Sequence, residues 1–231
     1  MADDDSKVFL ITGASTGIGA ATARQAAREG YRVVLAARSN DKLDALAQEL
    51  GGEDRALAVG CDVTDWEQQE AMVASALDAF GRLDVVFANA GFGGARGFLE
   101  DSPEHWRDMV LTNVLGVAYT IRATLPELRE RAGHVVITSS AAGRRALQGS
   151  LYSASKHAVT AMGESLRQDV NGTGMRVTLI EPGMVDTPFF DNPVTDALEA
   201  EDIARAVMFA VTQPPHVDVN EMLIRPTAQD G

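Results

Sequence analysis

The chain has 231 residues, of which 45% are hydrophobic, and its formal net charge is −13. This length is enough to bury the core of one α/β domain and too short for two comfortable domains. Because an acidic surface repels phosphate backbones, nucleic acid is excluded as an expected partner. The sequence contains no run of about 18 apolar residues, so no membrane span is expected.

The start of the chain and its cysteine content bear on location. The opening MADDDSK lacks the basic and apolar regions of a secretory signal, and residues 1–6 are expected to form a disordered tail. Cys61 is the single cysteine, so it cannot form an internal disulfide, and its default role is that of a small buried hydrophobe. These features favour a soluble, cytoplasmic protein.

Short apolar runs alternate with longer amphipathic stretches along the chain. In the first half the sequence predicts, in order, strand 7–13, helix 17–30, strand 32–38, helix 41–50, strand 55–63, helix 65–81 and strand 83–91. In the second half it predicts helix 102–131, strand 133–143, helix 152–171, strand 175–183, helix 199–212 and a short last strand at 220–226.

The predicted strands are runs of Val, Ile and Leu without polar alternation, as expected when helices cover both faces of a parallel sheet. A series of βα units predicts an α/β fold of three layers, with a doubly wound, Rossmann-type parallel sheet between helices. No linker rich in Pro, Gly or Ser divides the chain, so residues 1–231 are expected to form a single domain.

A glycine-rich turn, TGASTGIG, joins the first predicted strand to its helix and contains Gly13, Gly17 and Gly19. Glycine permits positive φ in such a turn and lets a phosphate approach the N–H groups of a helix N-terminus. The spacing is G-x-x-x-G-x-G, and alone it fits a tight structural turn as well as a cofactor site. Its place after the first strand of a βαβ series favours the cofactor site.

The end of the second predicted strand indicates which dinucleotide is preferred. An acidic residue there would bind the ribose 2′-OH of NAD, whereas an Arg accommodates the 2′-phosphate of NADP. The sequence has Arg38 and no Asp or Glu at this point, which favours NADP(H); the alternative is that Arg38 is a solvated loop residue. Asp62, after the third strand, is placed to bind the adenine amino group or to cap a turn.

Six motifs occur in one order along the chain. They are TGASTGIG, NAG at 89–91, Asn113 in NVLG, SSAAG at 139–143, YSASK at 152–156 and EPGMVDT at 181–187. This series resembles the short-chain dehydrogenase/reductase family over essentially the whole chain. The ending QPPHVDVNEMLIRPTAQ is similar to the branch that contains NADP-dependent 3-hydroxy-acid and serine dehydrogenases.

Tyr152 and Lys156 lie four residues apart, on one face of a predicted helix. A free Tyr has a pKa of about 10, and a neighbouring ammonium group lowers it. In an isolated helix, however, such a pair is usually exposed to solvent and has no catalytic role. The resemblance implies that Tyr152 is the general acid in reduction and the base in oxidation. It implies that Lys156 lowers the pKa of Tyr152 and binds the nicotinamide ribose, and that Asn113 holds a water linking Lys156 to solvent.

The resemblance also implies an NADP(H) site in which Thr187 binds the nicotinamide carboxamide while Asn89 and Gly91 line the cleft. The cofactor-binding residues expected together are Gly13, Ser15, Thr16, Gly17, Ile18, Gly19, Arg38, Asp62, Val63, Asn89, Ala90, Gly91, Tyr152, Lys156, Pro182, Gly183, Val185 and Thr187.

Two adjacent serines compete for the role of orienting the substrate carbonyl. The S-x-x-G motif of the family selects Ser140, whereas the usual distance to the tyrosine selects Ser139. Because side chains alternate along a strand, only one of the two should face the cleft. We choose Ser140 and place a one-residue deletion in the following loop, since loops absorb deletions more easily than strands.

The substrate pocket is less defined by the sequence. Only a short segment follows EPGMVDT before the next helix, where many relatives have a longer lid. Phe189 and Phe190 are expected either as apolar walls or as packing for the next helix. Arg144 and Arg145 could receive a substrate carboxylate or remain solvated, and the Gly-rich loop 91–97 either shapes the pocket or simply connects.

The expected function is an NADP(H)-dependent oxidoreductase that interconverts a small carbonyl compound and a secondary alcohol, for example a hydroxy acid, by hydride transfer, with Asn113, Ser140, Tyr152 and Lys156 as catalytic residues. The alternatives are a non-catalytic dinucleotide sensor or scaffold on the same fold, and an isomerase or dehydratase, whose relatives tend to be longer. The histidines show no metal spacing, so no metal site is expected. A homo-oligomer, either a tetramer or a dimer, is expected because helices 104–131 and 152–171 pack between subunits in family tetramers.

Overall fold

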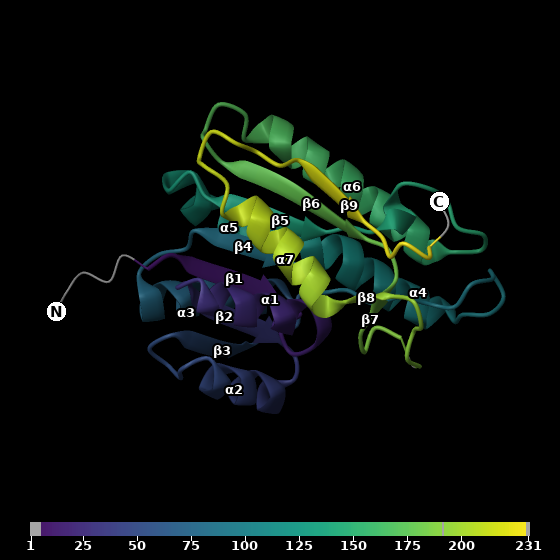
Figure 1. Ribbon diagram of the computed structural model, residues 1–231, viewed down its shortest axis with the longest axis horizontal. Coiled ribbons are helices and arrows are strands. Elements are labelled where there is room, and N and C mark those ends of the chain that lie inside the picture. Colours follow the sequence, from purple (N-terminus) through teal and green to yellow (C-terminus); the bar gives the residue numbers. More distant parts are fainter. Residues whose placement is uncertain (1–5, 191, 230–231) are drawn as a thin grey trace.

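Parallel strands rich in Val, Ile, Leu and Ala form the central sheet of the computed structural model (Figure 1). The structure describes residues 6–190 and 192–229, so the tail expected at 1–6 lies outside these residues except for Ser6. The strands are β1 (Val8–Thr12), β2 (Arg32–Ala37), β3 (Ala56–Gly60), β4 (Val85–Ala88), β5 (His134–Thr138), β6 (Arg176–Pro182) and β9 (Glu221–Ile224). Their spatial order is β3-β2-β1-β4-β5-β6-β9, so the winding direction reverses between β1 and β4. The predicted doubly wound sheet is therefore confirmed.

Helices cover both faces of this sheet (Figure 1). Buried side chains of α1 (Gly17–Arg28), α2 (Asn40–Glu49) and α7 (Ala200–Val211) form one core with one face of the strands. Those of α3 (Trp66–Phe80), α5 (Val117–Glu130) and α6 (Leu151–Asp169) form a second core with the other face. The arrangement is a three-layer, Rossmann-type single domain, as the sequence predicts.

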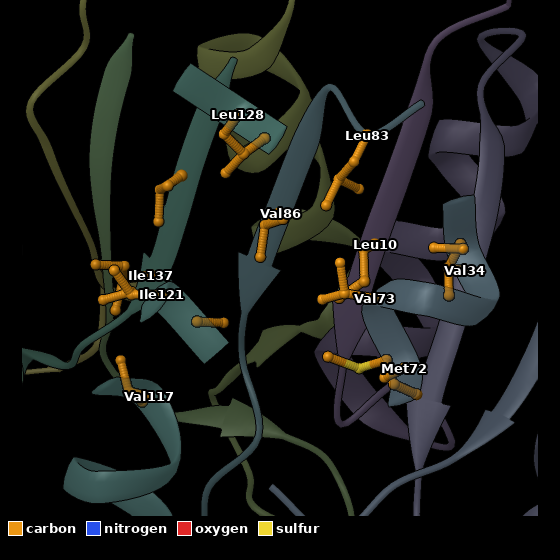
Figure 2. Close-up of a cluster of buried hydrophobic side chains, with 14 of the residues drawn as sticks. Leu10, Val34, Met72, Val73, Leu83, Val86, Val117, Ile121, Leu128 and Ile137 are labelled. Carbon is orange, nitrogen blue, oxygen red and sulfur yellow. The ribbon is translucent and has the colours of Figure 1, made fainter. Parts of the chain in front are cut away.

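Alternation along β1 shows how one strand serves both cores. Phe9 and Ile11 belong to the core under α1, whereas Val8 and Leu10 belong to the core under α3. Figure 2 shows Leu10 and its neighbours on other strands facing side chains of α3 and α5. Because both faces are buried, residues 8–11 of the strand are all apolar, and the polar Thr12 comes only at its carboxyl end.

The long helix expected at 102–131 is interrupted. It begins as α4 (Pro103–Val110), where the Ser102 side chain accepts a hydrogen bond from the N–H of His105. It then widens into a π-helical segment at Leu111–Gly116 before continuing as α5. π-helical turns are rare and are frequent at functional sites. This one carries Asn113.

The segment expected as strand 133–143 and the start of the next helix also differ from the prediction. β5 ends at Thr138, and Ala141–Gly143 form a 3₁₀ turn behind Ser140. α6 begins one residue earlier than expected, with Ser150 as its N-cap accepting from the N–H of Ser153. Tyr152 therefore lies in the first turn of α6. A two-stranded sheet of β7 (Val185–Asp186) and β8 (Leu198–Glu199) was not predicted, because two-residue strands leave no periodic signal.

Candidate active site

A cavity of about 490 Å³ opens at the carboxyl ends of the strands, where β1 and β4 lie side by side. In doubly wound folds the ligand binds at such a reversal of strand order. Eighteen predicted site residues line it: Gly13, Ser15, Thr16, Gly17, Ile18, Arg38, Asp62, Val63, Asn89, Ala90, Gly91, Ser140, Tyr152, Lys156, Pro182, Gly183, Val185 and Thr187. The two that do not line it are Gly19 and Asn113, which lie behind its wall.

The glycine turn supplies one end of the cavity. Gly13 and Gly17 have φ values of 66° and 52°, which other residues adopt at a cost. A β-carbon on Gly19 would lie 2.3 Å from the carbonyl oxygen of Gly13, so this glycine lets α1 pack tightly against the turn. The N-terminus of α1 then opens into the cavity, and its N–H groups and dipole favour a phosphate there.

The adenine end of the cavity is lined by residues that follow β2 and β3. Arg38 is exposed and lines this end together with Ser39. The Asp62 carboxylate accepts hydrogen bonds from the N–H and the hydroxyl of Thr64, so it caps a turn while also lining the cavity. Both roles considered for Asp62 are compatible with this position.

Asn89 ties three strand ends together below the cavity. Its Nδ2 donates to the carbonyl of Thr12, its N–H donates to the Thr12 hydroxyl, and its Oδ1 accepts from the hydroxyl of Thr138. The side chain is thus used to hold β1, β4 and β5 in register. Thr12 and Thr138 were not singled out from the sequence, since a threonine at a strand end carries no motif.

Tyr152 and Lys156 lie together in the cavity, and the Lys156 ammonium lies 5.7 Å from the centre of the Tyr152 ring. Lys156 is buried, and its Nζ donates to the carbonyl of Thr138 at 2.8 Å. Burial without a carboxylate partner lowers the pKa of Lys156 to about 8. The pair therefore belongs to the cavity rather than to a solvated helix face.

Burial raises the pKa of Tyr152 to about 12, and a hydrogen bond with Ser140 offsets part of this rise. The protein by itself thus holds Tyr152 in its neutral, proton-donating form at physiological pH. A lowered pKa of Tyr152 was expected from the nearby lysine. The pKa is raised instead, because the loss of water around the phenol is the larger effect.

The two serines after β5 both line the cavity, but their hydroxyls have different partners. Ser139 is buried against α6, where its hydroxyl interacts with Thr160 and the carbonyl of Lys156. Ser140 instead hydrogen-bonds with Tyr152 and with the carbonyl of Pro182. Its Oγ also accepts from the N–H of Ala142. The alternation expected from strand geometry therefore places Ser140 beside the phenol.

Asn113 cross-links the wall behind the cavity. Its amide exchanges two hydrogen bonds with the backbone of Phe92, at 3.0 and 2.8 Å, and contacts the Ser155 hydroxyl at 3.3 Å. The side chain is fully buried in the π-helical segment. This joins the loop after β4 to α6, the helix that carries Tyr152 and Lys156.

Arg144 and Arg145 separate in the structure. Arg144 pairs with the buried Glu181 carboxylate of β6 at 2.7 Å and with Glu221 of β9. Its guanidinium is therefore committed to the sheet, which removes it as a receiver of a substrate carboxylate. Arg145 lines the cavity, as does Arg96 from the loop after β4.

Phe189 and Phe190 both line the cavity and meet edge-on, with 5.0 Å between ring centres. Phe189 also lies edge-on to Tyr152 at 5.6 Å. At the far end of the chain, the Gln229 side chain accepts from the N–H of Met184 and closes the cavity wall beside Gly183. Nothing in the sequence pointed to Gln229. No group of His, Cys, Asp and Glu in the described residues could hold a metal ion.

Comparisons with known proteins agree with this geometry. The short chain dehydrogenase family model matches residues 7–198. The chain belongs to the short-chain dehydrogenase family. An uncharacterized oxidoreductase of Staphylococcus haemolyticus is 40% identical over 231 residues, which cover 98% of this chain and all of that protein.

Two solved structures of this family share the fold closely. The alcohol dehydrogenase from the archaeon Thermococcus sibiricus, complexed with 5-hydroxy-NADP, is 34% identical with a TM-score of 0.90, covering 98% of this chain and 99% of that one. The closed form of serine dehydrogenase, complexed with NADP+, is 33% identical with a TM-score of 0.90, covering 97% and 96%. The resemblance read from the six motifs is confirmed, and this short-chain dehydrogenase is an oxidoreductase with a dinucleotide-binding fold. No helix in the described ranges is long and apolar enough to cross a membrane.

Proposed function

We propose that this short-chain dehydrogenase is an NADP(H)-dependent enzyme that interconverts a small carbonyl compound and a secondary alcohol, with Tyr152 as the general acid and base. One observation carries the proposal: the glycine turn and Tyr152, with Lys156 and Ser140 beside it, line a single cavity. Lys156 would also serve a dinucleotide site, but such a site alone does not require a phenol and a serine hydroxyl placed side by side.

The cavity fits a dinucleotide at both ends. The α1 N-terminus and the backbone around Gly13 and Gly17 would hold the pyrophosphate, because glycines there leave N–H groups accessible. Arg38 would hold the 2′-phosphate, since no carboxylate in the described residues lies at the end of β2 to bind a free 2′-OH. The NADP ligands of the Thermococcus sibiricus and serine dehydrogenase structures support the same choice for this chain.

At the nicotinamide end, Thr187 and Lys156 would hold the carboxamide and the ribose. Bound NADPH supplies the hydride for carbonyl reduction. The chain's own residues supply the rest: Ser140 and Tyr152 donate hydrogen bonds that orient and polarise the substrate oxygen. Tyr152 then gives its phenolic proton to that oxygen, which breaks the phenol O–H bond and leaves a phenolate.

Lys156 supports the proton transfer from Tyr152 electrostatically. Its ammonium lies 5.7 Å from the centre of the phenol ring, and a positive charge there stabilises the phenolate that forms. A pKa of about 8 also allows Lys156 to pass a proton toward Tyr152 and regain one from solvent. The role of Asn113 in holding a water for this return path is part of the proposal.

A hydroxy acid or keto acid is the substrate class that the charges favour. Arg96 and Arg145 line the cavity, and the acidic residue that lines it in the described ranges is Asp62, at the adenine end. A substrate carboxylate would meet guanidinium groups there. We expect a keto acid to have a lower KM than its methyl ester, and Arg145→Ala and Arg96→Ala to raise the KM of the acid alone.

A panel of aldehydes, ketones and keto acids, followed by NADPH absorbance, tests the function directly. Turnover of at least one carbonyl compound is expected. Binding of NADPH without any turnover would instead favour the non-catalytic sensor or scaffold.

The Arg38→Asp variant tests the cofactor choice. It should shift preference from NADPH toward NADH by about tenfold or more, since it replaces a favourable charge by a repulsive one next to the 2′-phosphate. An unchanged preference would place the 2′-phosphate contact elsewhere.

We also propose a homo-oligomer, a tetramer or a dimer, in the cytoplasm. Light scattering after size-exclusion chromatography measures the mass of the assembly directly. A monomer in that measurement would refute the first of these two proposals.

A further inference from the structure

Phe189 stands over the catalytic tyrosine. It belongs to the segment after β7, and its ring meets Tyr152 edge-on at 5.6 Å and an interplanar angle of 63°. The ring of Phe190 also contacts it edge-on, at 5.0 Å between ring centres. Although it lies in this aromatic cluster, Phe189 is 40% exposed, and it lines the cavity together with Tyr152.

The opposite wall of the cavity is shaped to receive this ring. Gly93 belongs to the loop after β4, and a β-carbon there would lie 2.7 Å from Cζ and 3.0 Å from Cε1 of Phe189. Its φ lies outside the left-handed region, so the backbone itself would permit a side chain. A side chain at position 93 would therefore compete with the ring of Phe189 for the same space.

These contacts connect two loops across the cleft. The ring spans from the segment after β6 and β7 to the loop after β4, with the Tyr152 ring beside it. The aromatic contacts of Phe189 are with Tyr152 and Phe190. A ring in this position must share the space next to the phenol with any substrate.

We propose that Phe189, seated on Gly93, is an aromatic gate that limits the substrate to carbonyl compounds with small substituents next to the reacting carbon. The gate rests on the proposed function. Branched aliphatic or aryl substituents would have to displace the ring from Gly93, whereas a methyl group fits beside it. The face of the ring supplies an apolar contact for the small substituent.

Two vicinal diketones that differ in one substituent test the size limit: 2,3-butanedione, with methyl, and 1-phenylpropane-1,2-dione, with phenyl. Phe189→Ala should raise the ratio of kcat/KM for the phenyl compound to kcat/KM for the methyl compound by about tenfold or more. Changes in the space available in an apolar pocket typically alter the discrimination between substrates by this amount. Phe189→Leu should give an intermediate ratio. Phe98→Ala, which removes an exposed aromatic ring outside the cavity, should leave the ratio unchanged.

A stability cycle tests the contact without any substrate. Gly93→Ala should lower the Tm of the wild-type chain, because the added methyl group collides with the ring of Phe189. The same substitution in the Phe189→Ala background should leave the Tm nearly unchanged. Equal shifts in both backgrounds would overturn the gate, as would turnover of both diketones with an unaltered ratio in Phe189→Ala.

Failure of the proposed function has a different signature. If no carbonyl compound is reduced by the wild-type protein while the Tm values remain coupled, the proposed function falls and takes the substrate gate with it. The two failures are therefore distinguished by whether turnover or coupling is lost.

Discussion

Lys156 should lower the free energy of unfolding of the protein, although we propose that it takes part in catalysis. Its ammonium is buried, it donates to the carbonyl of Thr138, and no carboxylate is among the causes of its altered pKa. Lowering its pKa from 10.5 to about 8 corresponds to about 3 kcal/mol of folding free energy lost near neutral pH. Lys156→Met removes this cost but leaves the Thr138 carbonyl without its donor, which costs about 1 kcal/mol. We therefore expect the variant to be more stable by about 2 kcal/mol, and inactive.

The pH dependence of unfolding isolates this effect. The pKa of Lys156 is lower in the folded chain than in the unfolded chain, so the unfolded chain binds more protons between pH 8 and 10.5. The destabilisation of the wild type by Lys156 therefore decreases as the pH rises through this window. Between pH 7.5 and 9.5 the loss of unfolding free energy caused by Lys156 should decrease by about 2 kcal/mol. Cys61, whose burial raises its pKa to about 11, acts in the opposite direction, but it is common to both chains and cancels in their difference.

Urea denaturation of the wild type and Lys156→Met at pH 7.5 and pH 9.5 gives the four free energies needed. The gap between the two proteins should be largest at pH 7.5 and narrow at pH 9.5. A variant that is less stable than the wild type, with a gap that does not change with pH, would refute the reasoning. Lys156 would then be held in its charged form by the fold at no cost.

Three further perturbations test other parts of the structure. His134 is buried, and its pKa is lowered to about 3, so about 2 kcal/mol of stability should be lost between pH 7.5 and 5 and largely retained in His134→Gln, as measured by urea unfolding. Gly19→Ala places a methyl group against the Gly13 carbonyl and should cost about 1–3 kcal/mol of stability and weaken NADPH binding, measured by fluorescence titration. Ser140→Ala should lower kcat about 10²-fold and Ser139→Ala far less, and the reverse order in steady-state assays would reassign the carbonyl-orienting role.

The sheet was predictable because both of its faces are buried. Such strands must be continuous apolar runs. In β1, Val8 and Leu10 face one core and Phe9 and Ile11 face the other, so the apolar run alone predicts the strand. The glycine turn and the Tyr152–Lys156 spacing were predictable for a similar reason. Each depends on local geometry that only certain residues at fixed separations can provide.

The contacts that bring distant segments together were not predictable. Asn113 in the π-helical segment hydrogen-bonds with Phe92, a residue 21 positions away, and no local pattern encodes this contact. The pairing of Arg144 with Glu181 likewise depends on how β5 and β6 lie in the sheet. The elevated pKa of Tyr152 is a property of its burial, and the fit of Phe189 on Gly93 exists only once two loops meet.

Tyr152→Phe tests the central claim most directly, because it removes one oxygen atom and leaves the ring that contacts Phe189 in place. Measured by NADPH oxidation with a carbonyl compound that the wild type reduces, kcat/KM should fall by about 10²–10⁴-fold, the usual worth of a general acid. The Kd for NADPH, measured in parallel by fluorescence, should stay close to the wild-type value. A variant that keeps turnover within a few-fold of the wild type would show that Tyr152 is not the proton donor and that the account is wrong.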